Sequence, residues 1–102
     1  MTKSDYYNDI IFPLPQNLKM KARIESLRFE KELYNLNIEN LQDKINKTKL
    51  SIDTTDIEDL KENFRINIME YDLKIMDYQT KMKLCDIQVL REQSNLKNYK
   101  DF

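Results

Sequence analysis

The feature that most constrains this chain is the lack of helix-breaking residues after Pro15. The sequence contains no glycine, and its two prolines, Pro13 and Pro15, both lie near the N-terminus. Without glycine, the chain cannot form the phosphate-binding loops, type I′ hairpin turns or helix caps that depend on glycine. The residues are 34% charged and 40% apolar, a composition typical of a long helix or coiled coil. The sequence therefore indicates an architecture before it indicates any chemistry.

A first long helix is predicted over residues 18–50, where apolar side chains recur at alternating spacings of four and three. Seven of nine positions in this repeat are apolar, and the nine are Met20, Ile24, Leu27, Lys31, Tyr34, Ile38, Leu41, Ile45 and Thr48. This spacing is that of a coiled-coil seam. Asn17 is the expected N-cap. A second stripe, formed by Phe29, Leu33 and Leu36, gives this helix the wider apolar face of a bundle helix.

A turn is predicted at residues 51–55, because Ser, Asp and Thr side chains compete with the helix by bonding local backbone groups. Thr55 and Glu58 have the spacing of a capping box that would start a second helix. That helix is predicted to run to about residue 92. Its seam is Phe64, Ile68, Tyr71, Ile75, Tyr78, Met82, Cys85 and Val89, with Ile57 and Leu60 extending it towards the turn. A partial second face comprises Ile66, Leu73, Met76, Leu84, Ile87 and Leu90.

We therefore expect an all-α fold in which residues 17–93 form a long antiparallel helical hairpin, a coiled coil. Residues 1–16 are expected to be an N-terminal extended, docking segment. Ser4 could cap a short helical turn over residues 6–9, but residues 10–15 must be extended, because each proline fixes its own φ and disfavours the helical region for the residue before it. Residues 94–102 are expected to form a short C-terminal helix or tail. An isolated two-helix hairpin buries little apolar surface, so we expect the hairpin to be completed as a three-helix bundle or by dimerisation.

The composition argues against several classes of function. The sequence has no His and only one Cys, so it holds no nucleophile–imidazole pair and no nitrogen or sulfur metal cluster. We expect no enzyme activity, no metal and no cofactor. Residues 1–50 carry nine basic and seven acidic side chains, a net +2, and residues 51–102 carry eight and eleven, a net −3. This balance offers no electrostatic footprint for nucleic acid. Cys85, on the seam, is expected to be a buried small hydrophobe.

The sequence also bears on the compartment. No run of 18 apolar residues is present, so no membrane span is expected. The N-terminus lacks the basic and continuous apolar regions of a signal peptide. We expect a cytoplasmic protein, or a nuclear one if it belongs to a nuclear assembly.

Residues 18–61 resemble tubulin-binding cofactor A, a family of small helical chaperones of β-tubulin. The matching segments are Leu18-Lys19-Met20-Lys21, then Leu27, Glu30 and Tyr34, then Lys44-Ile45 and Asp59-Leu60-Lys61. The resemblance implies a cytoskeletal folding cofactor that binds β-tubulin through a helical face. The contacting residues that it implies are Lys19, Lys21, Glu30, Lys44, Asp59 and Lys61.

A looser likeness is to a coiled-coil spliceosomal subunit, in which a Leu-Pro leader precedes an Arg-Ile-Glu-x-Leu motif. Here these pieces are Leu14-Pro15 and residues 23–27. The alternative function is therefore a structural coiled-coil subunit of a larger splicing, kinetochore or tethering complex. Such a subunit would dock through Phe12, Leu14 and the stripe of Phe29, Leu33 and Leu36.

Overall fold

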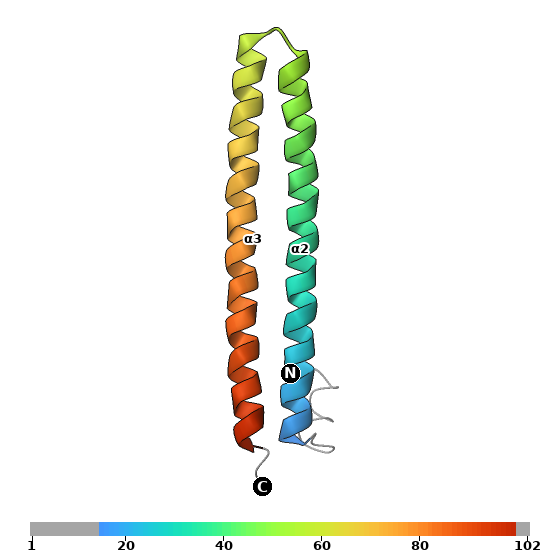
Figure 1. Ribbon diagram of the computed structural model, residues 1–102, viewed down its shortest axis with the longest axis vertical. Coiled ribbons are helices and arrows are strands. Elements are labelled where there is room, and N and C mark those ends of the chain that lie inside the picture. Colours follow the sequence, from blue (N-terminus) through green and yellow to red (C-terminus); the bar gives the residue numbers. More distant parts are fainter. Residues whose placement is uncertain (1–14, 100–102) are drawn as a thin grey trace, which may run out of the picture.

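The chain folds into two long antiparallel helices. The computed structural model describes residues 15–99, in which helix α2 spans Gln16–Thr54 and helix α3 spans Glu58–Tyr99. At 1.5 Å per residue, each helix is about 60 Å long. The helices lie side by side, so the start of α2 is next to the end of α3 (Figure 1). The predicted all-α helical hairpin is confirmed. Residues 15–99 contain no third helix, and completion of the hairpin as a three-helix bundle or by dimerisation stays a prediction.

The seam between the helices is the one that the four–three spacing predicts. Every predicted seam position from 20 to 48 and from 64 to 89 is buried or half-buried. The buried side chains, each less than a tenth exposed, are Ile24, Ile38, Leu41, Ile45, Ile75 and Cys85. Ile57 and Leu60 are exposed, so their predicted place in the seam is wrong. Lys61 takes this seam position instead and is half-buried. It lies three residues before Phe64 and so continues the repeat.

The centre of the hairpin is a small cluster of Ile38, Leu41, Ile45 and Ile75. Half-buried side chains, among them Ile68 and Met82, pack against it. Two tyrosine side chains extend the contact between the helices beyond this cluster. The Tyr34 and Tyr78 rings lie 5.8 Å apart between centroids, and Lys81 Nζ lies 5.3 Å from the Tyr78 ring centroid. The core is therefore one layer deep and is closed at its edges by long amphipathic side chains.

Helix α2 begins earlier than predicted. Pro15 is its N-cap, and the Pro15 carbonyl accepts hydrogen bonds from the backbone N–H groups of Leu18 at 3.0 Å and Lys19 at 3.1 Å. Asn17 is not the N-cap, and its Oδ1 accepts from the N–H of Leu18 within the first turn. Proline needs no N–H partner, so it can stand directly before the first helical turn.

The turn lies later in the chain than the predicted residues 51–55. Helix α2 continues through Thr54, and the connection is residues 55–57. The hydroxyl of Ser51 donates to the Lys47 carbonyl, and that of Thr54 donates to the Leu50 carbonyl, at 3.2 and 3.0 Å. These side chains bond backward to the preceding turn and so leave the helix intact. Thr55, with extended backbone, ends it.

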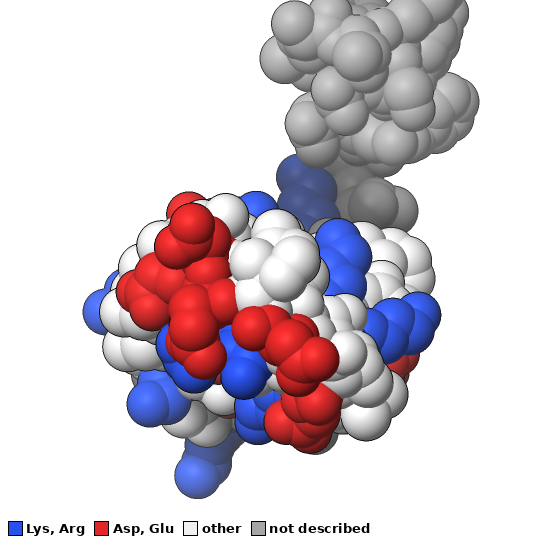
Figure 2. All heavy atoms as spheres, turned by 90° about the horizontal axis from the view of Figure 1, so that it is seen from above, with Lys and Arg blue, Asp and Glu red and all other residues white. Residues whose placement is uncertain are grey.

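Thr55 does not form the predicted capping box with Glu58. Helix α3 begins only at Glu58, and the Thr55 hydroxyl accepts a hydrogen bond from the N–H of Ile57 at 3.4 Å. The acidic side chains at the start of α3 still suit the positive end of the helix dipole. Asp and Glu side chains gather at this end of the hairpin (Figure 2).

The predicted break near residue 94 is also absent, because α3 runs through to Tyr99. Leu96 is half-buried and keeps the seam repeat. Glu92 Oε1 accepts a hydrogen bond from Arg23 Nη1 of α2 at 2.7 Å. Contacts with the start of α2 therefore carry α3 beyond the point where its own sequence becomes polar.

Candidate protein-binding surface

Helix α3 carries a second apolar stripe that the hairpin leaves uncovered. Its residues recur at spacings of three and four, except that Thr80 and Lys83 occupy two positions of the repeat and Leu84 lies one residue after Lys83. We call this set the outer stripe: Ile66, Met69, Leu73, Met76, Leu84, Ile87 and Leu90. Each of these side chains is between 44% and 66% exposed. The stripe covers about 36 Å of helix at 1.5 Å per residue, a length suited to docking another long helix.

The outer stripe faces away from α2. Successive helix residues are about 100° apart around the axis, so Leu73 and Ile75 point in nearly opposite directions. Ile75 is 8% exposed and Leu73 is 66% exposed. The outer stripe is thus a separate face of the helix and not the solvent-exposed margin of the seam. Most of these residues belong to the partial second face that the sequence predicts, but the predicted docking stripe was the one on α2.

Carboxylates flank the middle of the outer stripe. Glu70, Asp72 and Asp77 are exposed and adjoin Met69, Leu73 and Met76 in sequence. Asp77 Oδ2 pairs with Lys81 Nζ at 3.0 Å. Glu70 and Asp72 form no ion pair within the described part of the chain. These residues occupy the positions that contact the flanks of a partner helix in a coiled coil.

The stripe predicted for docking on α2 is exposed but shorter. Phe29, Leu33 and Leu36 are 65%, 45% and 52% exposed. They span only two turns, and the next exposed apolar residue towards the turn is Leu50. Phe12 and Leu14, the other predicted docking residues, lie outside the described residues.

The six charged residues implied by the family resemblance do not form one patch. Lys21, Lys44 and Asp59 are exposed, whereas Lys19 is half-buried. Lys19 and Lys21 are two residues apart and therefore point about 160° away from each other. Lys61 is half-buried, with its Nζ 3.5 Å from Glu58 Oε1.

Glu30 is engaged within its own helix. The Tyr34 hydroxyl donates to Glu30 Oε1 at 2.5 Å, and this hydrogen bond raises the pKa of Tyr34 to about 12. Burial and the negative charge of Glu30 contribute in the same direction. Glu30 therefore positions a seam tyrosine in the hairpin itself.

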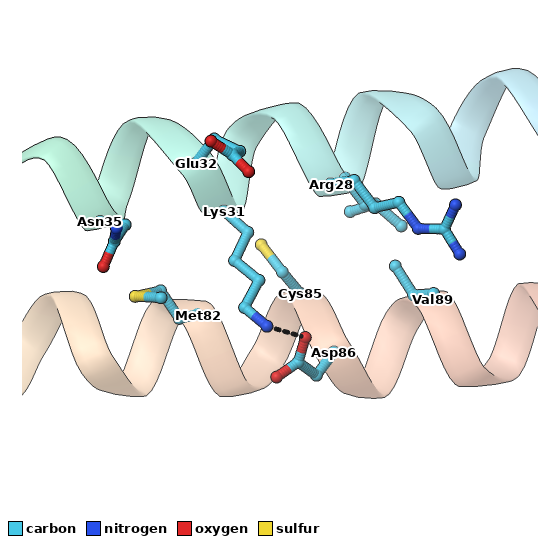
Figure 3. Close-up of a pocket in the computed structure, with 9 residues that line it drawn as sticks. Arg28, Lys31, Glu32, Asn35, Met82, Cys85, Asp86 and Val89 are labelled. Atoms are coloured by element: carbon cyan, nitrogen blue, oxygen red, sulfur yellow. Dashed lines mark ion pairs between the residues drawn. The ribbon is translucent and has the colours of Figure 1, made fainter.

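A groove of about 400 Å³ lies where α2 and α3 meet around Cys85. Lys31 Nζ and Asp86 Oδ1 bridge the two helices there at 2.8 Å, beside Cys85 (Figure 3). Burial raises the pKa of the Cys85 thiol, and the carboxylates of Glu30 and Asp86 raise it further, while Lys31 lowers it. The thiolate is the reactive form, so this environment favours a packing role for Cys85.

Cys85 should consequently react slowly with a thiol reagent. At pH 8 we expect the folded chain to be labelled by a disulfide reagent at least about tenfold more slowly than the chain in urea, because burial suppresses both access and the thiolate. The sequence holds a single Cys, so absorbance of the released thiolate reports this site alone. Equal rates in buffer and urea would contradict the burial of Cys85.

Among residues 15–99, no group of three or more Cys, Asp or Glu side chains is arranged to hold a metal ion. Neither described helix is long and apolar enough to cross a membrane. No protein-family model matches the sequence, and comparisons with curated proteins and with solved structures give no match.

Proposed function

We propose that this chain is a non-enzymatic, protein-binding helical hairpin that serves as a coiled-coil subunit of a larger assembly. The single observation that carries the proposal is the exposure of the outer stripe on α3. A contiguous apolar surface rimmed by charged residues is typical of a protein interaction site. The proposal needs no pocket and no reactive group.

The energetics favour a docking role for this surface. The buried core comprises only six side chains, one of them the small Cys85, so the seven residues of the outer stripe include more large apolar side chains than the core does. Covering a half-exposed side chain of this size is worth about 1 kcal/mol. Seven such side chains can therefore support stable association after the entropic cost of binding is met.

The second candidate is the β-tubulin folding cofactor implied by the resemblance of residues 18–61. One observation favours it: Lys21, Lys44 and Asp59, all from the matching motifs, are exposed and available to a partner. Under this hypothesis β-tubulin would contact charged residues, whereas the assembly hypothesis places the contact on the outer stripe.

Affinity isolation from the native cell tests both candidates. The tagged full-length chain is compared with a stripe variant, Leu73→Gln with Met76→Gln, and a charge variant, Lys21→Glu with Lys44→Glu. All four positions are exposed, so we expect folding to be retained, as circular dichroism would verify. For an assembly subunit, a defined set of proteins accompanies the wild type and the charge variant, and falls at least about tenfold with the stripe variant.

The β-tubulin candidate gives a different result in the same experiment. β-Tubulin would accompany the wild type and the stripe variant and would be lost with the charge variant. Co-elution of the purified chain with β-tubulin on a sizing column with light scattering would then follow. Identical protein sets from all three chains would contradict both candidates.

A further inference from the structure

We propose that the outer stripe of α3 binds one helix of a different protein, with Lys or Arg flanking the apolar repeat of that helix. This inference rests on the proposed function and specifies the partner's chemistry. The basic side chains would stand opposite Glu70 and Asp72.

A helix is the element that fits the spacing of the outer stripe. Apart from the interruption at Thr80 and Lys83, its residues recur at spacings of three and four, which is the repeat that a second helix meshes with by knobs-into-holes packing. An extended strand laid along the stripe would present side chains at every second residue. Its backbone N–H and C=O groups would also find no partners on a helix surface, which is costly when they are buried. The partner segment is therefore helical over several turns.

The flanking charges specify the partner further. In a coiled coil, the residues next to the apolar positions face the flanks of the partner helix and set partner choice. Glu70 follows Met69, and Asp72 precedes Leu73. Glu70 and Asp72 are exposed and have no ion pair among the described residues. A partner with Lys or Arg at the matching positions would neutralise both carboxylates at once.

Lys83 also bears on how the partner helix is aligned along α3. It occupies an apolar position of the repeat, between Met76 and Ile87, and is exposed. A polar residue at such a position specifies register and orientation at some cost in stability. We expect the partner helix to carry a carboxylate or an amide opposite Lys83, with its basic residues towards Asp72.

A second copy of the chain fits the outer stripe poorly in the parallel direction. An in-register parallel pair places Lys83 against Lys83 at an apolar position. It also places Asp72 of each helix beside Asp77 of the other, because flanking residues pair five apart in parallel coiled coils. Arg65 would approach Glu70 and Asp86 would approach Arg91, but Arg65 and Asp86 already pair within the chain, with Glu62 at 3.5 Å and with Lys31 at 2.8 Å, and neither contact relieves the facing pair of Lys83 side chains.

The antiparallel direction has the same difficulty. When the two ends of the stripe are matched, Ile66 faces Leu90, and the flanks then place Asp72 beside Asp86 and Asp77 beside its own copy. Like charges so placed oppose association.

Shifting one of the two antiparallel helices along the other by one heptad separates these carboxylates, but it also changes which apolar residues meet. Ile66 then faces Lys97, and Met69 faces Ser94, so the stripe loses apolar contacts at both ends. The sequence of the N-terminal segment also lacks the pattern that this stripe would bind. Its apolar residues 10–12 directly precede Pro13 and show no three–four repeat.

Two designed peptides of four heptads test the inference, each fluorescently labelled and titrated with the full-length chain. Both have Ile and Leu at the apolar positions and Glu opposite Lys83. One carries Lys at all flanking positions and the other carries Glu. We expect the Lys peptide to bind at least about tenfold more tightly by fluorescence anisotropy, because charge complementarity selects the partner.

Charge-reversed variants test whether the preference for the Lys peptide arises at Glu70 and Asp72. Glu70→Lys with Asp72→Lys should reverse the preference between the two peptides. A matched control, Asp43→Lys with Asp53→Lys, changes the net charge equally but lies outside the outer stripe, so the preference for the Lys peptide should remain. If the control abolishes the preference as well, the attraction is to overall charge and the inference is wrong.

The remaining outcomes separate this inference from the proposed function. If both peptides bind equally and Leu73→Gln with Met76→Gln abolishes both, the stripe is a docking surface but the basic partner is wrong. If neither peptide binds, the inference fails, and the cell-derived protein sets decide the proposed function independently. If light scattering shows a dimer at micromolar concentration that the stripe variant converts to monomer, the occupant is a second copy and the inference is overturned.

Discussion

Replacing Leu41 by Asp is expected to unfold the hairpin. Leu41 is 8% exposed and lies in the central cluster with Ile38, Ile45 and Ile75. An unpaired carboxylate there would lose its hydration without gaining a partner, so the side chain would destabilise the fold by several kcal/mol. A single-layer core of six buried residues has little reserve to offset that loss. We expect helical ellipticity at 222 nm to fall sharply and the cooperative thermal transition to disappear.

The control for this substitution is Leu36→Asp on the same helix. Leu36 is 52% exposed on the face that points away from α3, so an Asp there remains hydrated and should change the melting temperature little. Ile68→Asp, at the edge of the central cluster, should behave as Leu41→Asp does. Full helicity and an unchanged melting temperature in both Leu41→Asp and Ile68→Asp would show that the seam is assigned to the wrong face.

Replacing Ile75 by Ala is expected to lower the free energy of unfolding by about 2–4 kcal/mol. Ile75 is the buried residue that α3 contributes to the central cluster, and it packs against three residues of α2. Truncation removes apolar burial and leaves a void that the two straight helices cannot close fully. Urea denaturation monitored by circular dichroism measures this loss as a lower transition midpoint.

Leu73→Ala is the matched control, because the residue lies only two positions away on the same helix. Its side chain is 66% exposed on the outer stripe, so truncation should change the free energy of unfolding by no more than about 0.5 kcal/mol. Equal losses at Ile75 and Leu73 would mean that both faces of α3 are buried in solution. The two variants together therefore measure the asymmetry on which the candidate binding surface depends.

The helical hairpin and its seam were predictable because their signal is repeated many times. Lys31 and Thr48 interrupt the apolar pattern of α2, but the surrounding positions keep the spacing of four and three. An error at one position does not change the face on which the others lie. Lys31 remains in the seam because its stem packs there and its Nζ reaches Asp86 of α3 at 2.8 Å.

The ends of the helices were less predictable because each depends on a few local groups. Ser51 and Thr54 favour turns by propensity, yet their hydroxyl groups bond to carbonyls of the preceding helical turn. The same side chain can thus end a helix or continue it at nearly equal energy. The sequence does not indicate which of these two roles the hydroxyl groups take. The turn was therefore predicted too early in the chain.

The amino-acid pattern alone predicts that the chain is helical, has two long segments and pairs them along one face. Glycine is absent, proline is confined to the N-terminal segment and the seam repeats over many turns, so local preference and pattern agree. The extension of α3 to Tyr99 and the exposure of its outer stripe within the described residues became evident only from the folded hairpin. Those features depend on contacts between distant residues, such as Arg23 with Glu92, and on the lack of a third helix in residues 15–99. A three–four repeat shows that a face is apolar, but only the arrangement of neighbouring elements determines whether that face is buried.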